Sequence, residues 1–232
     1  MRLSIFIRTY RGDSKWLAYC LYGIKKFVKH DELIIICPKG DRQIIYDVAK
    51  DYDHKLYTTK EKCNGYLAQQ ADKLRSPEWC TGDIIMIVDS DCIFKEPVGI
   101  DTFIKDEKPI LLRTKYSSMD GAVLQWQSIT EKAIGFRSDW EYMRRLPLLF
   151  WRDTLIAVKN AFPNIQNHIE QQKGHEFSEF NFIGQFIEKW ENHKYSIINT
   201  EEFLPKEVCA QFWSWSKMTN NEEIMIKKIL VL

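Results

Sequence analysis

The sequence is poor in glycine and proline, with 10 glycines and 7 prolines among 232 residues. This scarcity argues against collagen-like or disordered proteins and against architectures built on glycine-rich loops. The six cysteines form no C-x-x-C pair and have no regular spacing, which argues against both a zinc site and a disulfide scaffold. We therefore expect reduced thiols in a cytoplasmic protein.

The sequence also has no excess of charge of one sign. It holds 33 Lys and Arg against 32 Asp and Glu, a formal net charge of +1. This balance removes the global electrostatic argument for a dedicated polyanion binder. No apolar run approaches the roughly 18 residues of a membrane span, and the run at the N-terminus is too short for a signal peptide. We expect a soluble protein that stays in the cytoplasm where it is made, or in the host cytoplasm for a phage protein.

Apolar and aromatic residues, in contrast, are plentiful. The chain is 45% apolar and 13% aromatic, and at 27.6 kDa it can bury a core without help from disulfides or metal. We found no internal repeat and no linker rich in Gly, Ser or Pro. The sequence therefore predicts one domain over residues 1–232, with aromatic side chains available to line a cleft.

Hydrophobic periodicity predicts an alternation of strands and helices in the first half. Continuous apolar runs predict strands at 3–10, 32–37 and 83–88, with a weaker strand at 55–58. Helices are expected to begin near residues 14, 41 and 65, the second with Ile44, Ile45 and Val48 facing inward. This alternation predicts an α/β fold, a mixed but mostly parallel sheet flanked by helices, whose ligand site lies at the carboxyl ends of the strands.

The second half of the sequence is less regular. Strands are expected at 109–113 and 148–151, a polar and aromatic loop at 115–127, and helices at 128–134, 153–161 and 179–190. We interpret residues 109–232 as the acceptor-facing part of the same domain.

The strongest chemical signal is Asp89-Ser90-Asp91, directly after the most hydrophobic run in the chain. Two carboxylates at the exit of a buried strand cannot both face a dry core, whereas a divalent cation satisfies both and a diphosphate completes its shell. A solvated turn with capping aspartates is the structural alternative. The buried strand before this segment favours the cation site.

Three segments in order carry a family resemblance: Arg8-Thr9-Tyr10, the stretch NGYLAQQADKL at 64–74, and Asp89-Ser90-Asp91. Together they resemble the nucleotide-sugar-binding half of GT-A-fold glycosyltransferases, and most of all a sparsely characterised bacterial and phage group. The pattern G-[WY]-x-x-Q-Q-x-x-K-L is the most specific part. Segments 143–150 and 175–184 also resemble this group, so the similarity spans roughly residues 3–187.

The resemblance implies a metal-dependent hexosyl- or pentosyltransferase with residues 1–108 binding the donor, most simply a UDP-sugar. A cation, Mn²⁺ or Mg²⁺, neutralises the leaving diphosphate. Asp91 is then the direct and catalytic metal ligand, while Asp89 binds ribose or metal and Ser90 lies in the donor site. The remaining donor contacts are expected from Arg8, Thr9 and Tyr10 at the end of the first strand, and from Gln70 and Lys73 on one helix face.

Glu179 is the candidate catalytic base. It starts an amphipathic helix after Ser178, so an N-cap followed by a first-turn acid explains the pair structurally. The functional hypothesis places the Glu179 carboxylate beside the acceptor hydroxyl. His175 is a possible metal or phosphate contact, and the third metal ligand stays open because no His follows His193.

The acceptor is unknown from the sequence: a glycan, a small molecule or, in a phage, a hydroxymethylated DNA base. The segments 115–127 and 211–215 carry aromatic residues that suit an acceptor cleft or a core end. Basic groups at Lys25, Lys26 and Lys29 and at Arg144-Arg145 suit either solvent or a polyanion.

Two other functions remain open. A sugar-nucleotide nucleotidyltransferase also uses carboxylate-bound magnesium, but normally has a glycine-rich phosphate loop after its first strand, where this chain has only Gly12. A noncatalytic carbohydrate- or nucleic-acid-binding module explains the aromatic residues but gives Asp89 and Asp91 no role.

Overall fold

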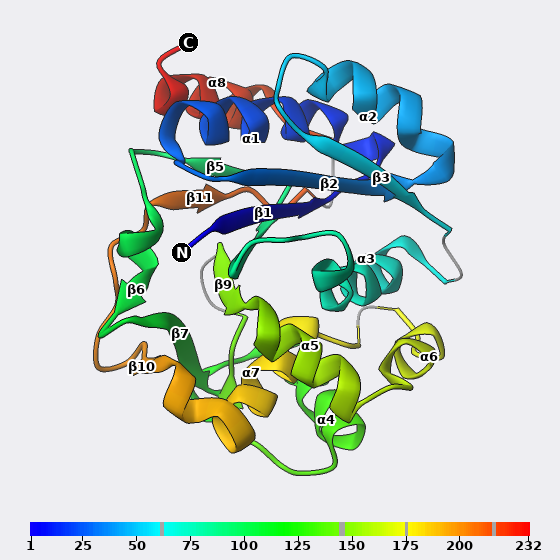
Figure 1. Cartoon of the computed structure of the whole chain (residues 1–232), viewed down its shortest axis with the longest axis vertical. Coiled ribbons are helices and arrows are strands. Elements are labelled where there is room, and N and C mark those ends of the chain that lie inside the picture. Colours follow the sequence, from blue (N-terminus) through cyan, green and yellow to red (C-terminus); the bar gives the residue numbers. More distant parts are fainter. Residues whose placement is uncertain (61–62, 144–146, 175, 215–216) are drawn as a thin grey trace.

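The computed structural model describes residues 1–60, 63–143, 147–174, 176–214 and 217–232 (Figure 1). Its centre is a five-stranded sheet in the order β3-β2-β1-β4-β9. The four N-terminal strands are parallel and β9 is antiparallel to β4. The predicted α/β fold with a mixed, mostly parallel sheet is thereby confirmed. The strands are β1 (Leu3–Arg8), β2 (Glu32–Pro38), β3 (Lys55–Thr59), β4 (Ile84–Asp89) and β9 (Leu148–Trp151).

The central strands are buried on both faces, as their continuous apolar runs predict. Every residue of β1 is buried, and so are residues 84–88 of β4. The parallel register of these two neighbours places Arg8 opposite Asp89. Because both residues end their strands, the side chains that follow β1 and β4 meet at one edge of the sheet.

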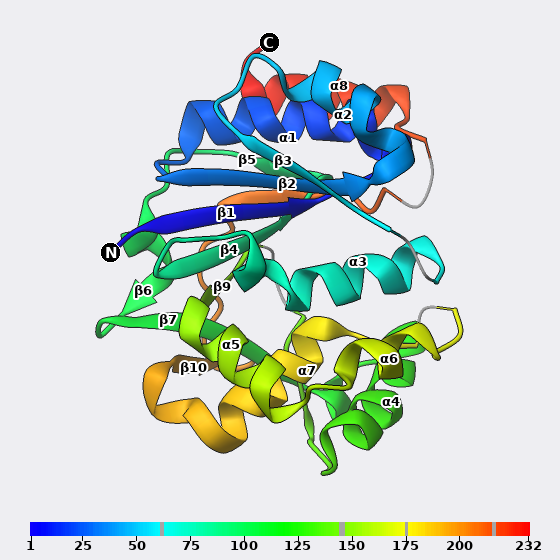
Figure 2. The same ribbon diagram turned by 45° about the vertical axis from the view of Figure 1, so that its right-hand side comes forward.

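Helices lie on both sides of this sheet (Figures 1 and 2). On one side are α1 (Ser14–Phe27), α2 (Arg42–Ala49) and α8 (Asn220–Leu230). On the other are α3 (Gly65–Leu74), α4 (Leu124–Ile134), α5 (Arg152–Ala161), α6 (Ile165–Glu170) and α7 (Glu179–Phe186). Buried apolar side chains from both halves of the chain belong to one hydrophobic cluster.

Two smaller sheets complete the described part of the chain. In one, β7 (Lys108–Lys115) pairs with β10 (Ser196–Asn199), β6 (Ile104–Lys105) and β8 (Trp140–Glu141). In the other, β5 (Cys92–Phe94) pairs antiparallel with β11 (Cys209–Gln211). Since β5 follows Asp91 directly, this pairing brings residues near 211 beside the end of β4.

Several sequence predictions were wrong in detail. Ile44 is 42% exposed, because α2 buries Ile45 and Ala49 instead. The expected loop at 115–127 is largely helical: two short 3₁₀ turns precede α4, which begins at Leu124 rather than at 128. The expected helix 179–190 ends its α-helical part at Phe186 and continues as a π-helical turn, Ile187–Glu191.

Glycine has a steric role inside α7. A Cβ on Gly184 would lie 2.1 Å from Cγ of Tyr142, a fully buried ring. Only glycine therefore lets this ring lie directly on the helix backbone. All six cysteines are free. Among the helices described, none has both the length and the apolar character needed to cross a membrane.

Candidate functional site

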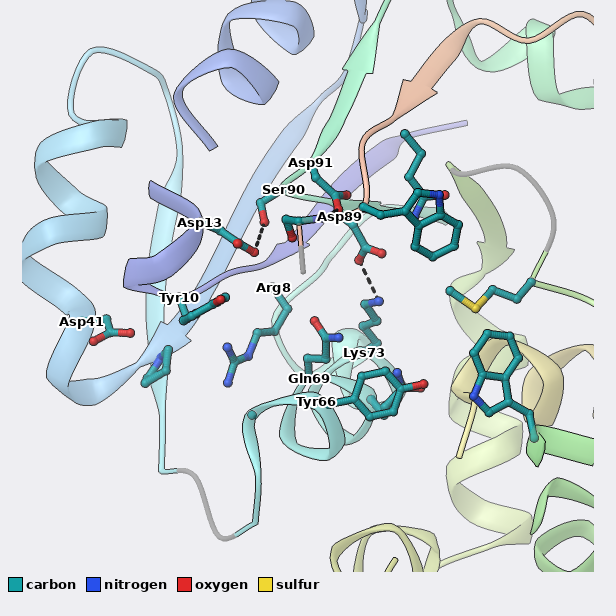
Figure 3. Close-up of a pocket in the computed structure, with 18 residues that line it drawn as sticks. Arg8, Tyr10, Asp13, Asp41, Tyr66, Gln69, Lys73, Asp89, Ser90 and Asp91 are labelled. Carbon is teal, nitrogen blue, oxygen red and sulfur yellow. Dashed lines mark hydrogen bonds and ion pairs between the residues drawn. The ribbon is translucent and has the colours of Figure 1, made fainter. Parts of the chain in front are cut away.

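A cavity of about 490 Å³ opens at the carboxyl ends of β1 and β4 (Figure 3). This is the edge at which an open α/β sheet is expected to bind its ligand. The volume falls within the usual range of small-molecule and cofactor sites. The cavity is lined by Arg8, Tyr10, Asp13, Pro38, Asp41, Gly65, Tyr66, Gln69, Gln70, Lys73, Asp89, Ser90, Asp91, Trp126, Met143, Gln211, Trp213 and Ser214.

The segment Asp89-Ser90-Asp91 lies at the inner wall of the cavity. Asp91 is only 6% exposed, and its Oδ2 accepts the backbone N–H of Ser214 at 2.9 Å. Burial, and then the nearby charge of Asp89, raises the pKa of the Asp91 carboxyl to about 7. Keeping the carboxylates of Asp89 and Asp91 both ionised so close together at the end of a buried strand therefore costs electrostatic free energy.

Asp13 is a third carboxylate in this wall, and it is not among the site residues predicted from the sequence. An aspartate directly before a helix is ordinarily an N-cap, but the Asp13 side chain makes no capping hydrogen bond to α1. Its Oδ2 instead accepts a hydrogen bond from the Ser90 hydroxyl at 2.8 Å. Burial raises the pKa of Asp13, and the charge of Asp89 adds to that rise. The sequence feature that could have identified Asp13 as a site residue is its position shortly after the first strand.

Lys73 lies beneath these carboxylates with its side chain 1% exposed. Its Nζ is 2.7 Å from Oδ1 of Asp89 and 2.9 Å from Oε1 of Glu179, and it lies 4.7 Å from the ring centre of Phe180. Burial alone would lower the pKa of Lys73, but Asp89 and Glu179 raise it above its usual value. The ammonium therefore stays charged between two carboxylates.

Glu179 does not line the cavity, although the sequence suggested a base there. Its side chain is fully buried behind Lys73, and burial raises the pKa of its carboxyl against the opposing effect of Lys73. Its backbone N–H donates to Oε1 of Gln70 at 2.8 Å. The expected N-cap is present one residue earlier, where Oγ of Ser178 accepts the N–H of Asn181.

The three residues that end the first strand differ in position. Arg8 is buried, with Nε 3.3 Å from Oδ2 of Asp72, yet it still lines the cavity. Thr9 is 1% exposed and does not line the cavity, and its backbone N–H donates to the Ile36 carbonyl. Tyr10 is 44% exposed and faces the cavity.

Tyr10 is placed by the local backbone. A Cβ on Gly12 would lie 2.4 Å from the Tyr10 ring, so the ring lies directly over the glycine backbone. The phenol therefore lines the cavity and stays half-exposed rather than lying in the core. Such a half-exposed ring is suited to stacking on a flat ligand.

The charge around the end of β4 fits a bound cation. In the part of the chain that the structure describes, no group of three or more His, Cys, Asp or Glu side chains forms a preformed metal cluster. Mg²⁺ and Mn²⁺ sites for phosphate ligands, however, often use one or two carboxylates and leave the other positions to water and phosphate. Asp91, with Asp89 or Asp13 beside it, offers hard oxygen donors of this kind. Burial first, and then the neighbouring charge of Asp89, raise the pKa values of Asp13 and Asp91, and a divalent cation beside them would favour their ionised forms.

Aromatic side chains from distant segments line the rest of the cavity. Tyr66 comes from α3, Trp126 from α4, and Trp213 from the residues that follow β11. Trp213 is 53% exposed. Of the segments 115–127 and 211–215, which the sequence suggested for an acceptor cleft, Trp126, Gln211, Trp213 and Ser214 line the cavity. The side chains of Lys25, Lys26 and Lys29 on and after α1 do not line it, and His175, Arg144, Arg145 and Trp215 lie outside the described residues.

No protein-family model matches the sequence, and no curated protein matches it significantly. Solved structures do match it in fold. A 4-diphosphocytidyl-2C-methyl-D-erythritol synthase from Anaerococcus prevotii DSM 20548 superposes with a TM-score of 0.55 at 14% identity, over 100% of this chain and 99% of that one. The galactosyltransferase LgtC, in complex with donor and acceptor sugar analogues, superposes with a TM-score of 0.60 at 9% identity, over 98% and 95%. The chain therefore has a GT-A-like, Rossmann-type fold.

Proposed function

We propose that the chain is a metal-dependent glycosyltransferase, which transfers a sugar from a nucleoside diphosphate sugar to a hydroxyl acceptor. The observation that carries this proposal is the meeting of Asp89, Asp91 and Tyr10 in one cavity. Two carboxylates for a cation and a ring for a base lie where the carboxyl ends of β1 and β4 adjoin. The likeness in fold to a galactosyltransferase supports it.

Four of the residues that line the cavity have a chemical task in this proposal. Tyr10 stacks on the base, and Arg8 lies close enough to the same wall to bind ribose or phosphate oxygen. Asp91 and Asp89 hold Mn²⁺ or Mg²⁺, which when bound supplies charge to stabilise the leaving diphosphate. In the transfer, the bond from the anomeric carbon to the diphosphate oxygen breaks, and a bond from the acceptor oxygen to that carbon forms. The acceptor proton passes to a base or to water.

Glu179 is not placed to act as that base. Its carboxylate is buried behind Lys73, away from the lining of the cavity. An acceptor hydroxyl in the cavity would therefore have to reach past the lysine to meet it. In the proposal Glu179 acts on the donor site instead, through its ion pair with Lys73.

The likeness in fold to a 4-diphosphocytidyl-2C-methyl-D-erythritol synthase supports the nucleotidyltransferase alternative. Such enzymes are expected to bind phosphate at the N-terminus of the helix after the first strand. Here the segment before that helix, α1, holds a single glycine, Gly12, where such enzymes normally have a glycine-rich phosphate loop. This favours the glycosyltransferase.

The aromatic part of the cavity suits an acceptor that presents a ring. Tyr66, Trp126 and Trp213 add stacking and apolar surface, and sugars bind such surfaces through their C–H faces. Among the described lining residues the only cations are Arg8 and Lys73, and both are paired with carboxylates. A saccharide acceptor therefore fits better than a DNA acceptor, which would need several phosphate contacts.

The proposal is tested by incubating the protein with a panel of nucleoside diphosphate sugars in Mn²⁺ or in chelator. Slow donor hydrolysis should release nucleoside diphosphate and free sugar, only with the cation, and Asp91→Asn should abolish it. Release of pyrophosphate from a nucleoside triphosphate and a sugar phosphate would identify a nucleotidyltransferase. Absence of any nucleotide binding would favour a noncatalytic module.

A further inference from the structure

Three charged side chains from three separate elements form a buried chain of ions behind the cavity. They are Asp89 at the end of β4, Lys73 in α3 and Glu179 at the start of α7. Lys73 Nζ lies 2.7 Å from Asp89 and 2.9 Å from Glu179. The outer member, Asp89, is 19% exposed at its side chain, whereas Lys73 and Glu179 are 1% and 0% exposed.

The inner end of this chain is rigidly held. Glu179 occupies the first turn of α7, after the Ser178 cap, and its backbone N–H is fixed by Gln70 of α3. The ring of Phe180 lies against the Lys73 ammonium. Oε2 of Glu179 is buried and has no hydrogen-bond partner among the described residues. Burying a carboxylate in this way costs free energy of folding, which suggests that Glu179 has a functional role.

The charges of Asp89, Lys73 and Glu179 indicate what this role is. An ammonium 2.7 Å from Asp89 cancels much of the negative charge that a cation at Asp89 requires. Glu179 places an equal negative charge 2.9 Å from the same ammonium. Because both partners are buried, solvent and salt screen these interactions little. Glu179 and Lys73 thus form a nearly neutral pair, and Asp89 keeps its charge for a cation.

We infer that Glu179 is a positioning residue that sets the charge balance of the donor site, so that the site takes a divalent cation together with a diphosphate rather than a diphosphate alone. This inference rests on the proposed function, because it assigns the cation to Asp89 and Asp91. It gives Glu179 no contact with the reacting atoms. It also explains why Gln70 belongs to the site: its amide oxygen holds the helix turn that carries Glu179.

The test is Glu179→Gln, measured with two separate probes: Mn²⁺ alone, followed by electron paramagnetic resonance, and inorganic pyrophosphate in chelator, followed by calorimetry. The variant leaves the Lys73 charge uncompensated. We expect Mn²⁺ affinity to fall about tenfold or more, equivalent to about 1.4 kcal/mol, while pyrophosphate affinity stays the same or rises. A merely structural role would weaken both probes together, and that result would overturn the inference.

Two further variants separate charge from shape. Glu179→Asp retains the charge and should keep Mn²⁺ affinity close to that of the unchanged protein. The pair Lys73→Met with Glu179→Gln removes one positive and one negative charge, and should restore Mn²⁺ affinity relative to Glu179→Gln alone. Failure of that recovery would contradict the charge argument. This pair also keeps the inference testable where the single variant does not fold.

A matched control is Asp139→Asn, since the Asp139 side chain is 79% exposed and does not line the cavity. It removes the same formal charge and should leave both affinities unchanged. If the unchanged protein binds neither Mn²⁺ nor pyrophosphate, the proposed function fails. If it binds both but Glu179→Gln shifts them in the same direction, only the inference fails.

Discussion

The hydroxyl of Ser90 donates a hydrogen bond to Oδ2 of Asp13, with 2.8 Å between the two oxygens. The two residues are 77 positions apart in the chain. This bond joins the segment that ends β4 to the residue that precedes α1, so the first and fourth strands share one polar wall. Both side chains are buried, at 3% and 8% exposure.

Ser90→Ala removes this bond and leaves the Asp13 carboxylate short of a donor. Since hydrogen bonds to charged groups contribute more than neutral ones, the free energy of unfolding should fall by about 1.5–3 kcal/mol. Urea denaturation measures the change. Ser117→Ala, at an exposed serine, is the matched control and should leave the denaturation midpoint where it is. Equal midpoints for all three proteins would contradict the role of the bond.

Tyr10→Ala should weaken nucleoside diphosphate binding, because it removes from the lining of the cavity the ring that lies over Gly12. Loss of one base-stacking contact is expected to cost roughly 1–3 kcal/mol. Calorimetric titration in the presence of Mn²⁺ measures it. Tyr10→Phe keeps the ring and should bind close to normally. If the phenylalanine variant binds as weakly as the alanine variant, the hydroxyl rather than the ring makes the contact.

Asp91 should make stability depend on pH in the absence of a cation. Its pKa is raised from 3.8 to about 7 in the folded chain. Between these values the folded state binds more protons than the unfolded state, so stability falls as pH rises from about 4 to 7. Asp91→Asn removes this titration.

Urea unfolding at pH 5 and pH 8 in chelator provides the measurement. The unchanged protein should lose at least about 1 kcal/mol more than Asp91→Asn does over this interval. Added Mn²⁺ at pH 8 should restore part of the loss. Parallel pH profiles for the two proteins would show that Asp91 is ionised in the folded state throughout.

Lys73→Met should destabilise the fold strongly, because it leaves Asp89 and the buried Glu179 without their cation. Removing one partner of a buried ion pair typically costs about 3–5 kcal/mol. Lys50→Met, at an exposed lysine, is the control and should cost little. Denaturation midpoints compare the two. A small effect at Lys73 would mean that Glu179 is protonated in the folded chain.

The alternation of strands and helices in the first half could be predicted from the sequence, since β1, β2 and β4 are apolar runs and α1 has a clear apolar face. The place of the site followed from this order, because the carboxyl ends of parallel strands share one edge. The second half offered weaker patterns. There, α4 and the turn after α7 depend on tertiary packing, such as Tyr142 against Gly184.

The partners within the site could not be predicted in the same way. The sequence places Gln70 and Lys73 on one helix face, but it does not indicate that Glu179, 109 residues after Gln70, packs behind them. Lys73 was expected to meet phosphate, whereas it lies between two carboxylates. The contribution of Asp13 was likewise hidden, because an aspartate before a helix is ordinarily a cap.

The pairing of β5 with β11 bears on how the protein is made. The Ser214 N–H that holds Asp91 is synthesised 123 residues after it, which at ordinary translation rates is a delay of roughly 6–25 s. By the end of that time the parallel strands β1, β2 and β4 have long been synthesised, but until then β5 lacks its partner strand β11. Closure of so long a loop comes late in folding. The nascent chain therefore exposes an acidic strand end and an unpaired strand edge until the last part of the sequence has been made.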